Sequence, residues 1–441
     1  MKSLLRDNFC SSPWFHIRID WAGNYLPCRW SNNVDVSSYN IENTSMVEYM
    51  NSSFMQDLRT RLLNGVPEKM CASCRYEDQH SKVSGRQKQL LKSAVNLDNF
   101  QKTLCASPHF DDFNYSFNNN GLTTRTPVDL QIDLGNTCNS ACVICAPTFS
   151  SRLAHEYIKL QVINPELFTV NSPGANWTDA PALVDKFVSE LEDYPDIKYI
   201  HFLGGETLYL KSFYDICNRL IKSGYSKNVS IGTTTNCTVA TPELEHIIRE
   251  FKHVHLGLSV ECFHPVNDYV RYPSRIDSVT ENINRFIELR KQTGMHLALR
   301  ITPNILTITH LDTIFRFMLD HNIAAESCNI LHSPSCLRLE LLPKDLVELV
   351  QTKIDQVITD YNLVNDETAI VNRRSEDLTG TVISNVIFEY QSLMATLPTV
   401  NNIEKERYKL VDYLKAFEQV HDNKILDYLP EYEEFLRSYG Y

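Results

Sequence analysis

The chain has 441 residues, 43% of them hydrophobic, and a formal net charge of −12. This length and hydrophobic content suffice to bury a sizeable core in one large domain with an appendage, or in two to three smaller domains. The acidic balance gives no general attraction to phosphate backbones or anionic membrane surfaces, so neither nucleic acid nor a membrane is an expected partner.

The first residues, MKSLLRDNFC, lack an apolar stretch of signal-peptide length, and the sequence contains no run of about 18 apolar residues. We therefore expect a cytoplasmic protein with reduced thiols. Its 13 cysteines, several of them at metal-ligand spacing, favour metal binding over disulfides.

Residues 1–95 have the pattern of an irregular, cysteine-rich module. The sequence predicts a strand pair around 14–20 and 24–28 and a helix near 46–63, with too few apolar residues for a core of its own. Residues 96–127 contain a stretch rich in asparagine and turn formers, which predicts an exposed connection to the next domain.

From residue 128 to 342, short apolar runs alternate with amphipathic stretches. The predicted strands are 128–134, 197–203, 229–234, 254–260, 296–301 and 327–331, and the predicted helices are 183–191, 213–221, 244–251, 279–289 and 311–319. This alternation is typical of βα units around a parallel sheet buried on both faces. We expect an α/β fold with a partial (βα)6 TIM-like barrel, whose chemistry lies at the C-terminal ends of the strands.

Residues 343–441 have a helical pattern, with amphipathic stretches at 343–360, 382–396 and 403–420. Two interpretations are open. The segment either completes the core of the barrel or presents a surface to a partner or substrate.

Three cysteines, Cys138, Cys142 and Cys145, follow the first predicted barrel strand in the run LGNTCNSACVIC. Their spacing lets one short loop turn three thiolates toward a common point. A four-iron cluster takes a cysteine thiolate at each iron, so three protein ligands leave one iron open to another ligand. The alternative, three buried apolar cysteines, agrees less well with their clustering and their loop-forming neighbours.

This motif, with the apolar Ile144 before its last cysteine, resembles the radical S-adenosylmethionine (SAM) superfamily, and the resemblance covers roughly residues 128–340. It implies a 4Fe-4S cluster whose open iron is chelated by the amino and carboxylate groups of SAM. One electron, supplied by a donor such as flavodoxin or ferredoxin, cleaves SAM to methionine and a 5'-deoxyadenosyl radical that abstracts a substrate hydrogen. The protein orients the cofactor and excludes water and oxygen.

Gly204, Gly205 and Glu206 close the second predicted strand. By itself such a run is typical of an ordinary turn. In the family that the chain resembles, a Gly-Gly-Glu element at this place binds the SAM amino group. Two glycines let the backbone approach a ligand closely, and a carboxylate complements an ammonium group.

Weaker matches close the later strands. Thr235 and Asn236 end the third strand and Ser259 ends the fourth, and both places resemble positions that line the SAM ribose and methionine in relatives. Arg271 resembles an arginine that meets the SAM carboxylate, and Arg300 on the fifth strand is the alternative. Ordinary strand capping or a structural ion pair is the other interpretation of each residue.

Four further cysteines, Cys10, Cys28, Cys71 and Cys74, lie in the N-terminal module. Four thiolates close a metal site, and this donor set suits zinc as well as iron-sulfur. A cysteine, a spacer and then Gly-x4-Cys resemble the SPASM and twitch modules, which implies an auxiliary 4Fe-4S cluster. Such modules usually follow the barrel, whereas this one precedes it. A closed cluster would serve electron transfer or structure, and an open one could bind substrate.

The remaining cysteines have no ligand spacing, and most are predicted to be inert core thiols. They are Cys105, Cys217, Cys237, Cys262, Cys328 and Cys336. Cys237 and Cys262 follow predicted strands at the catalytic end, where a hydrogen-atom donor would lie. Tyr269 and Tyr272 are interpreted as wall residues, and no catalytic residue is assigned.

These patterns together predict a radical SAM enzyme. Many SPASM and twitch relatives act on peptides or protein side chains, so a peptide is the first substrate class by family analogy. A small molecule is the alternative within the enzyme class. The alternative from another class is a non-catalytic iron-sulfur or zinc protein that senses redox state. The Gly204-Gly205-Glu206 run argues against it, because a sensor needs no pocket for the SAM amino group.

Overall fold

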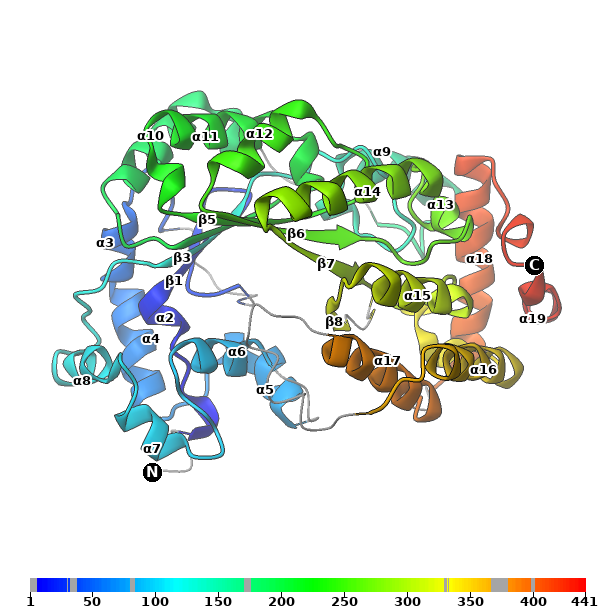
Figure 1. Cartoon of the computed structure of the whole chain (residues 1–441), viewed down its shortest axis with the longest axis horizontal. Helices are drawn as coiled ribbons and strands as arrows, with labels where there is room; N and C mark the ends of the chain where they lie inside the picture. The colour runs from blue at the N-terminus through cyan, green and yellow to red at the C-terminus, as the bar shows by residue number, and fades with distance from the viewer. Residues whose placement is uncertain are drawn as a thin grey trace.

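The computed structural model describes residues 6–29, 31, 38–79, 84–169, 176–328, 331, 333–365, 380–397 and 401–441. Within these ranges, eight strands form one sheet in the order β2-β1-β3-β4-β5-β6-β7-β8 (Figure 1). They are β1 His16–Ile19, β2 Tyr25–Leu26, β3 Asp129–Asp133, β4 Tyr199–Leu203, β5 Ser230–Thr235, β6 His253–Ser259, β7 His296–Ile301 and β8 Ala325–Cys328. Neighbours run parallel except for β1 and β2.

The parallel strands β3 to β8 confirm the predicted α/β partial barrel. The last strand begins before the predicted 327–331, of which residues 329 and 330 lie outside the described ranges. The helices between strands are α9 Ser151–Ile163, α10 Pro181–Glu192, α11 Lys211–Lys222, α12 Pro242–Glu250, α13 Val266–Val270, α14 Ile276–Thr293 and α15 Leu311–His321. The sequence pattern misses α9 and α13. In α9, Ile158 and Val162 are exposed, so the helix shows no clean polar face.

Local sequence sets where these helices begin and end. The Thr241 side chain caps α12 by accepting a hydrogen bond from the Leu244 amide (3.2 Å), and Pro242 takes the first helical position. Gly294 ends α14 in the left-handed conformation, with a φ of 69°. The helices α10, α11, α12 and α14 lie together on one side of the sheet (Figure 1).

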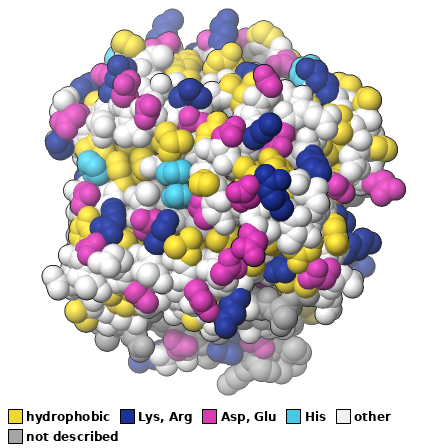
Figure 2. Space-filling view, turned by 90° about the vertical axis from the view of Figure 1, so that its right-hand side faces the viewer, with side chains coloured by type: hydrophobic (Ala, Val, Ile, Leu, Met, Phe, Trp, Pro, Cys, Tyr) yellow, Lys and Arg dark blue, Asp and Glu magenta, His cyan; other side chains and the backbone are white. Residues whose placement is uncertain are grey.

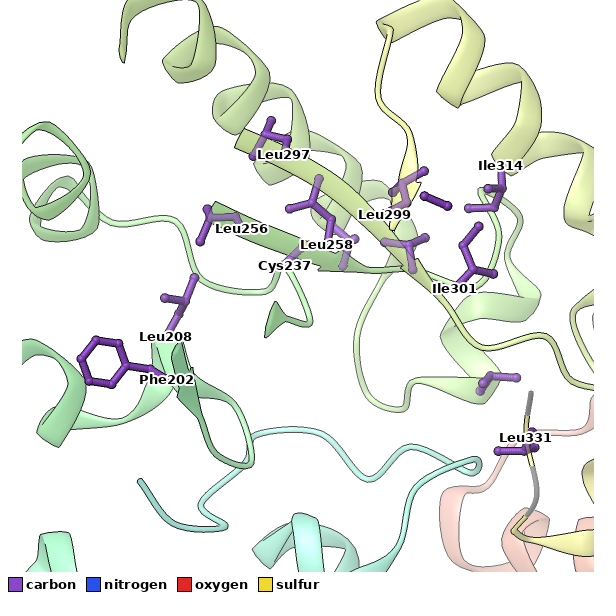
Figure 3. Packing of buried hydrophobic residues seen from close by; sticks show 14 of the residues in the cluster. Phe202, Leu208, Cys237, Leu256, Leu258, Leu297, Leu299, Ile301, Ile314 and Leu331 are labelled. Carbon is purple, nitrogen blue, oxygen red and sulfur yellow. The ribbon is translucent and has the colours of Figure 1, made fainter. Parts of the chain in front are cut away.

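The two faces of the sheet differ in chemistry. One is apolar, and Figure 3 shows Leu256 and Leu258 of β6 beside Leu297 and Leu299 of β7. The strand register places polar side chains on the other face, among them His16, Arg18, Asp129, Gln131, Asp133, Tyr199 and His201. Most of these are buried, so this face is a buried polar wall. Its signal in the sequence is the alternation of polar and apolar residues in runs such as DLQID.

The N-terminal module joins the barrel sheet, because β1 pairs in parallel with β3 and places His16 opposite Asp129. The predicted strand pair is therefore present and extends the barrel. The helices of the module are α2 Ser12–Phe15, α3 Met46–Met50, α4 Ser53–Leu63, α5 Ala72–Gln79 and α6 Gly85–Lys92. The predicted single helix at 46–63 is two helices, because the Ser52 side chain caps α4 by accepting a hydrogen bond from the Met55 amide.

Residues 96–127 are not an extended, exposed connection. They form α7 Phe100–Cys105 and α8 Phe110–Asn118. Phe100, Leu104 and Phe113 are buried in a small second core with Phe9 and Trp14. Burial of these apolar side chains outweighs the turn-forming residues nearby and attaches the segment to the N-terminal module.

The C-terminal segment is helical, as predicted, with α16 Lys344–Asp360, α17 Gly380–Ala395, α18 Ile403–His421 and a further helix, α19 Glu433–Ser438. Its apolar residues join the main hydrophobic core, which favours the interpretation that it completes the barrel. None of the described helices is long and apolar enough to cross a membrane. Over the described part of the face in Figure 2, acidic and basic side chains are interspersed rather than separated by sign.

Candidate active site

The cysteine loop lies between β3 and α9, at the C-terminal end of the first barrel strand. Burial raises the pKa of Cys138, Cys142 and Cys145, that of Cys145 to about 11. The Cys138 thiolate also raises the pKa of the other two thiols, so the three groups share one electrostatic neighbourhood. The structure thus brings the predicted ligands together. Metal binding requires the thiolate form, and the positive charge of iron offsets these raised values.

Serine side chains hold the N-terminal half of this loop. The Ser150 hydroxyl donates a hydrogen bond to the Ser140 carbonyl (2.6 Å) and accepts one from the Leu153 amide at the start of α9 (3.1 Å). The Ser151 hydroxyl accepts a hydrogen bond from the Cys138 amide (3.3 Å). The helix start and the cysteine loop are therefore one hydrogen-bonded unit.

The other half of the loop pairs with the segment around Arg271. The amides of Ala141 and Val143 donate hydrogen bonds to the carbonyls of Tyr272 (2.7 Å) and Val270 (2.8 Å). Arg271 lies between these two acceptors in the sequence. Its backbone is thus held alongside the cysteine ligands.

The Gly-Gly-Glu turn packs directly on the cysteine loop. The Gly205 amide donates a hydrogen bond to the Gly135 carbonyl (2.9 Å), and the Glu206 amide donates one to the Thr137 carbonyl (3.0 Å). A Cβ at Gly205 would lie 2.5 Å from the carbonyl oxygens of both Asn136 and Thr137. Only glycine permits this approach of one backbone to the other.

The Glu206 carboxylate is buried and held in one orientation. Its Oε1 accepts hydrogen bonds from the Thr235 hydroxyl (2.8 Å) and the Leu208 amide (3.1 Å), and its Oε2 accepts one from the Asn236 amide (2.6 Å). Burial raises the pKa of Glu206, and these donors partly offset the rise. A fixed carboxylate beside the cysteine loop complements an ammonium group, and Oε2 retains capacity for a further donor.

The Asn236 side chain joins the end of β5 to the cysteine loop. Its Nδ2 donates hydrogen bonds to Asn139 Oδ1 (2.9 Å) and Ser140 Oγ (3.0 Å), while its Oδ1 accepts one from the Thr238 amide (3.0 Å). The residue predicted to contact SAM is thus placed beside the loop, with its amide engaged by protein groups.

Ser259 and Ile144 are the remaining predicted SAM contacts. Ser259 ends β6 in register with Arg300, and its backbone lies beside the Cys237 thiol. Ile144 is partly buried and packs against the main hydrophobic core between two cysteine ligands. Contact of either residue with SAM stays a prediction from the resemblance.

Arg271 is fixed by Glu261, with which its Nη2 forms an ion pair. Glu261 is itself buried, and its Oε2 accepts a hydrogen bond from the Thr302 amide (2.7 Å). Burial alone would lower the pKa of Arg271, but the charges of Glu261 and the Cys142 thiolate outweigh it and raise the pKa. The Arg271 Nε is buried and has no hydrogen-bond partner in the described part of the chain. A guanidinium donor beside the thiols is thus unused by the protein.

Arg300, the alternative arginine, lies on the polar wall of the sheet. A Cβ at Gly257 would lie 2.9 Å from its Cγ, so the glycine lets the Arg300 side chain lie across β6. Burial lowers the pKa of His201 to about 3, and the charge of Arg300 contributes to this shift. The charge of Arg300 shifts the pKa of His201, whereas the charge of Arg271 shifts the pKa of the predicted cluster ligand Cys142. Arg271 is therefore the better candidate for binding the SAM carboxylate.

Sequence reasoning missed Glu261. It follows the last residue of β6 by two positions, and an acidic residue directly after an apolar strand is the signal that could have found it.

The four cysteines of the N-terminal module also converge. Burial raises the pKa of Cys10 well above its usual value, and the thiolates of Cys71, Cys28 and Cys74 raise it further. Burial raises the pKa of Cys71 to about 12 and that of Cys74 to about 11. All four predicted ligands, Cys10 included, therefore share one neighbourhood.

Within the described ranges, no three His, Cys, Asp or Glu side chains are arranged to hold one metal ion. A single zinc ion draws its sulfur ligands to about 2.3 Å from one centre, whereas a four-iron cluster spreads them over four irons.

The other cysteines differ in their surroundings. Cys217, Cys237, Cys262 and Cys336 are buried, and Figure 3 shows Cys237 near Leu258 of the apolar face. Cys105, at the end of α7, is exposed, so most but not all of these cysteines are core thiols, as expected. The side chain of Cys328 lies outside the described part of the structure.

Comparison with known families agrees with these two cysteine sets. Residues 132–305 match the family model of the radical SAM superfamily. Residues 10–75 match the SPASM family model, an iron-sulfur cluster-binding domain. The first match contains Cys138, Cys142 and Cys145, and the second contains the four N-terminal cysteines.

Solved structures resemble the chain only distantly. Streptococcus suis SuiB bound to S-adenosylmethionine shares 14% identity over 82% of this chain and 77% of that chain, with a TM-score of 0.37. SuiB bound to the precursor peptide SuiA shares 13% identity over 81% and 75%, with a TM-score of 0.36. Native anSMEcpe with bound AdoMet shares 16% over 54% and 62%, with a TM-score of 0.32. No curated protein matches the chain significantly.

Proposed function

The chain belongs to the radical SAM superfamily and carries a SPASM-type iron-sulfur domain, and on this premise we propose that it abstracts a hydrogen atom from a peptide or protein side chain and thereby modifies it. It is an enzyme with a SAM-binding 4Fe-4S cluster and an auxiliary cluster. When bound, the cluster and SAM supply the 5'-deoxyadenosyl radical. The chain's own residues bind, orient and enclose these groups.

In this proposal the residues at the strand ends divide the binding of SAM between them. Cys138, Cys142 and Cys145 hold three irons. Glu206 accepts hydrogen bonds from the SAM amino group, and Arg271 binds the SAM carboxylate. Thr235 fixes Glu206 and Glu261 fixes Arg271, so both charged groups are oriented before the ligand arrives.

One observation carries the assignment of the SAM site. The Gly-Gly-Glu turn is hydrogen-bonded to the cysteine loop, and on the loop's other side the Arg271 Nε is buried with no protein acceptor in the described ranges. Buried donors are satisfied in nearly all proteins, so an unused one beside three thiols indicates a place for a ligand acceptor. A carboxylate and a guanidinium on either side of the thiols complement the two charged groups of an amino acid.

The substrate class rests on the SPASM match, because many enzymes with such modules act on peptides. The polar wall of the sheet supports a polar substrate, since it carries His201, Gln131 and Arg300 rather than apolar side chains. For the auxiliary cluster, four thiol ligands favour a closed site that conducts electrons or stabilises the module. A closed cluster has no open iron for substrate.

A small-molecule substrate is the second candidate, and one experiment separates the two. The protein is reconstituted with iron and sulfide without oxygen, reduced with dithionite and given SAM with a cell extract. A peptide or protein substrate in the extract stimulates release of 5'-deoxyadenosine. Digestion of the extract with a protease, which is inactivated by heat before the assay, abolishes this stimulation. Stimulation that survives digestion would overturn the peptide proposal and favour a small molecule.

A further inference from the structure

Tyr413 of α18 reaches the cysteine loop from the C-terminal segment. Its hydroxyl donates a hydrogen bond to the Val143 carbonyl (2.8 Å), across 270 residues of sequence. Val143 lies directly after the cluster ligand Cys142. The bond is buried, so without it the Val143 carbonyl would lose a partner in a place that water does not reach readily.

The surroundings hold the Tyr413 ring in place. It stacks on Phe168, with ring centroids 5.2 Å apart and an interplanar angle of 24°. Burial raises the pKa of Tyr413 well above its usual value, and a neighbouring Tyr157 charge would raise it further. The stacked ring thus holds the hydroxyl where it donates to the Val143 carbonyl.

His421 makes a second attachment, two turns further along α18. Its Nε2 lies 2.7 Å from Glu156 Oε2 on α9. Its ring stacks on Tyr272, with centroids 3.9 Å apart and an interplanar angle of 13°. Tyr272 directly follows Arg271 and accepts a hydrogen bond from the Ala141 amide of the cysteine loop.

α18 therefore contacts three of the elements that surround the three thiols: the loop through Tyr413, α9 through His421 and Glu156, and the Arg271 turn through His421 and Tyr272. We propose that α18 forms part of the SAM site, with Tyr413 and His421 as positioning residues that keep the cysteine loop and the Arg271 turn at the spacing SAM requires. This inference rests on the proposed SAM site.

Such positioning is needed because the backbone is irregular on both sides of the proposed SAM site, in the cysteine loop and in the Arg271 turn. The cysteine loop has no helix or strand between β3 and the short helix η2 Pro147–Phe149, and Arg271 lies just beyond the five-residue α13. A ligand held by both the cysteine loop and the Arg271 turn binds more weakly when the spacing of these two segments varies, because binding must then order them at a cost in free energy. A long helix packed across both supplies the rigidity that the loops lack.

The test compares Tyr413→Phe with a matched control, Tyr432→Phe. Tyr432 also lies in the C-terminal segment, is buried and donates its hydroxyl proton to a distant carbonyl, that of Ile305, away from the cysteine loop. Both proteins are reconstituted without oxygen, and SAM affinity is measured by equilibrium dialysis together with the change that SAM causes in the electron paramagnetic resonance spectrum of the reduced cluster.

We expect Tyr413→Phe to bind SAM about three- to tenfold more weakly, the range set by the net strength of one hydrogen bond. Tyr432→Phe should bind SAM as the unmodified protein does, with a similar loss of unfolding temperature. Loss of the SAM-site cluster from Tyr413→Phe alone would also support the role of Tyr413. Unchanged affinity in Tyr413→Phe, or an equal loss in Tyr432→Phe, would overturn it.

A second pair tests His421. His421→Phe retains a ring to stack on Tyr272 but loses the contact with Glu156, whereas His421→Ala loses both. SAM affinity should fall further in the alanine variant, and equal affinities in both variants and the unmodified protein would contradict the role of His421. If the unmodified protein itself binds no SAM, the proposed function fails, and that outcome is distinct from the failure of α18.

Discussion

Arg29 donates a hydrogen bond to Asp129 of β3, the first strand of the barrel (2.9 Å). Because Arg29 directly follows the auxiliary ligand Cys28, this bond connects the N-terminal module to the barrel. Lys92 contacts the same carboxylate at 2.8 Å, and His16 Nδ1 lies 3.5 Å from it. Three groups of the N-terminal module thus converge on one buried carboxylate of β3. The two cysteine sets are therefore positioned relative to one another by charge as well as by strand pairing.

Replacing Asp129 by Asn should destabilise the protein by about 3 kcal/mol, because it leaves the largely buried Arg29 guanidinium without its counter-charge. Urea denaturation of the reconstituted protein checks this. The matched control is Glu250→Gln, which removes the carboxylate of an exposed ion pair with Lys227 and should leave the midpoint unchanged. Equal midpoints for both variants would refute a structural role for Asp129.

The same carboxylate predicts how stability responds to acid. Burial alone would raise the pKa of Asp129, but His16, Arg29 and Lys92 outweigh burial and hold it well below its usual range. The stabilisation is therefore fully present above the pKa of the unfolded chain, about 3.9, and is lost as pH falls through the lower folded pKa. The difference in thermal midpoint between the unmodified protein and Asp129→Asn should persist down to about pH 4. A difference that disappears by pH 6 would contradict this.

Glu206→Gln should weaken SAM binding about 10- to 100-fold, since it replaces the charge-assisted hydrogen bond between the Glu206 carboxylate and the SAM amino group by a neutral one. Because burial raises the pKa of Glu206, affinity in the unmodified protein should begin to fall at a higher pH than an ordinary glutamate would cause. Equilibrium dialysis across pH 8 to 5 measures both effects. The pH dependence should be absent from the variant, and an identical profile in both proteins would exclude Glu206 as the partner of the SAM amino group.

Gly205→Ala should disrupt the cysteine loop more than Gly204→Ala. The new Cβ at Gly205 would lie 2.5 Å from two backbone oxygens, whereas at Gly204 the nearest atom is Leu210 Cδ1 at 2.6 Å, the end of a flexible side chain. We expect Gly205→Ala to lose most of its SAM-site iron and Gly204→Ala to retain it, as measured by iron and sulfide content. The reverse order would show that the turn does not pack on the loop as described.

The sequence predicted the features that local pattern determines. The alternation of apolar runs and amphipathic stretches marked strands β3 to β8 and five of their helices, because each element carries its own periodicity. The spacing of Cys138, Cys142 and Cys145 marked the loop, because all three cysteines lie in one short stretch of sequence. The family matches to residues 132–305 and 10–75 confirm the resemblance drawn from these motifs.

Long-range relationships could not be predicted in this way. Nothing local in β1 indicates that His16 pairs beside Asp129, more than 100 residues away. Glu261 and Tyr413 act through partners that only the folded chain brings close. The prediction of an exposed connection at 96–127 relied on its asparagine-rich stretch. It missed that Phe100 and Phe113 contact a core made with distant residues.

The most direct test is the release of 5'-deoxyadenosine from SAM by the reduced, reconstituted protein and by a variant with Cys138, Cys142 and Cys145 all replaced by alanine. The unmodified protein should hold about eight irons and form the nucleoside, while the variant should keep about four irons, those of the auxiliary cluster, and form none. Equal nucleoside formation by both proteins, or none by either, would contradict the assignment of these three cysteines as ligands of a SAM-cleaving cluster.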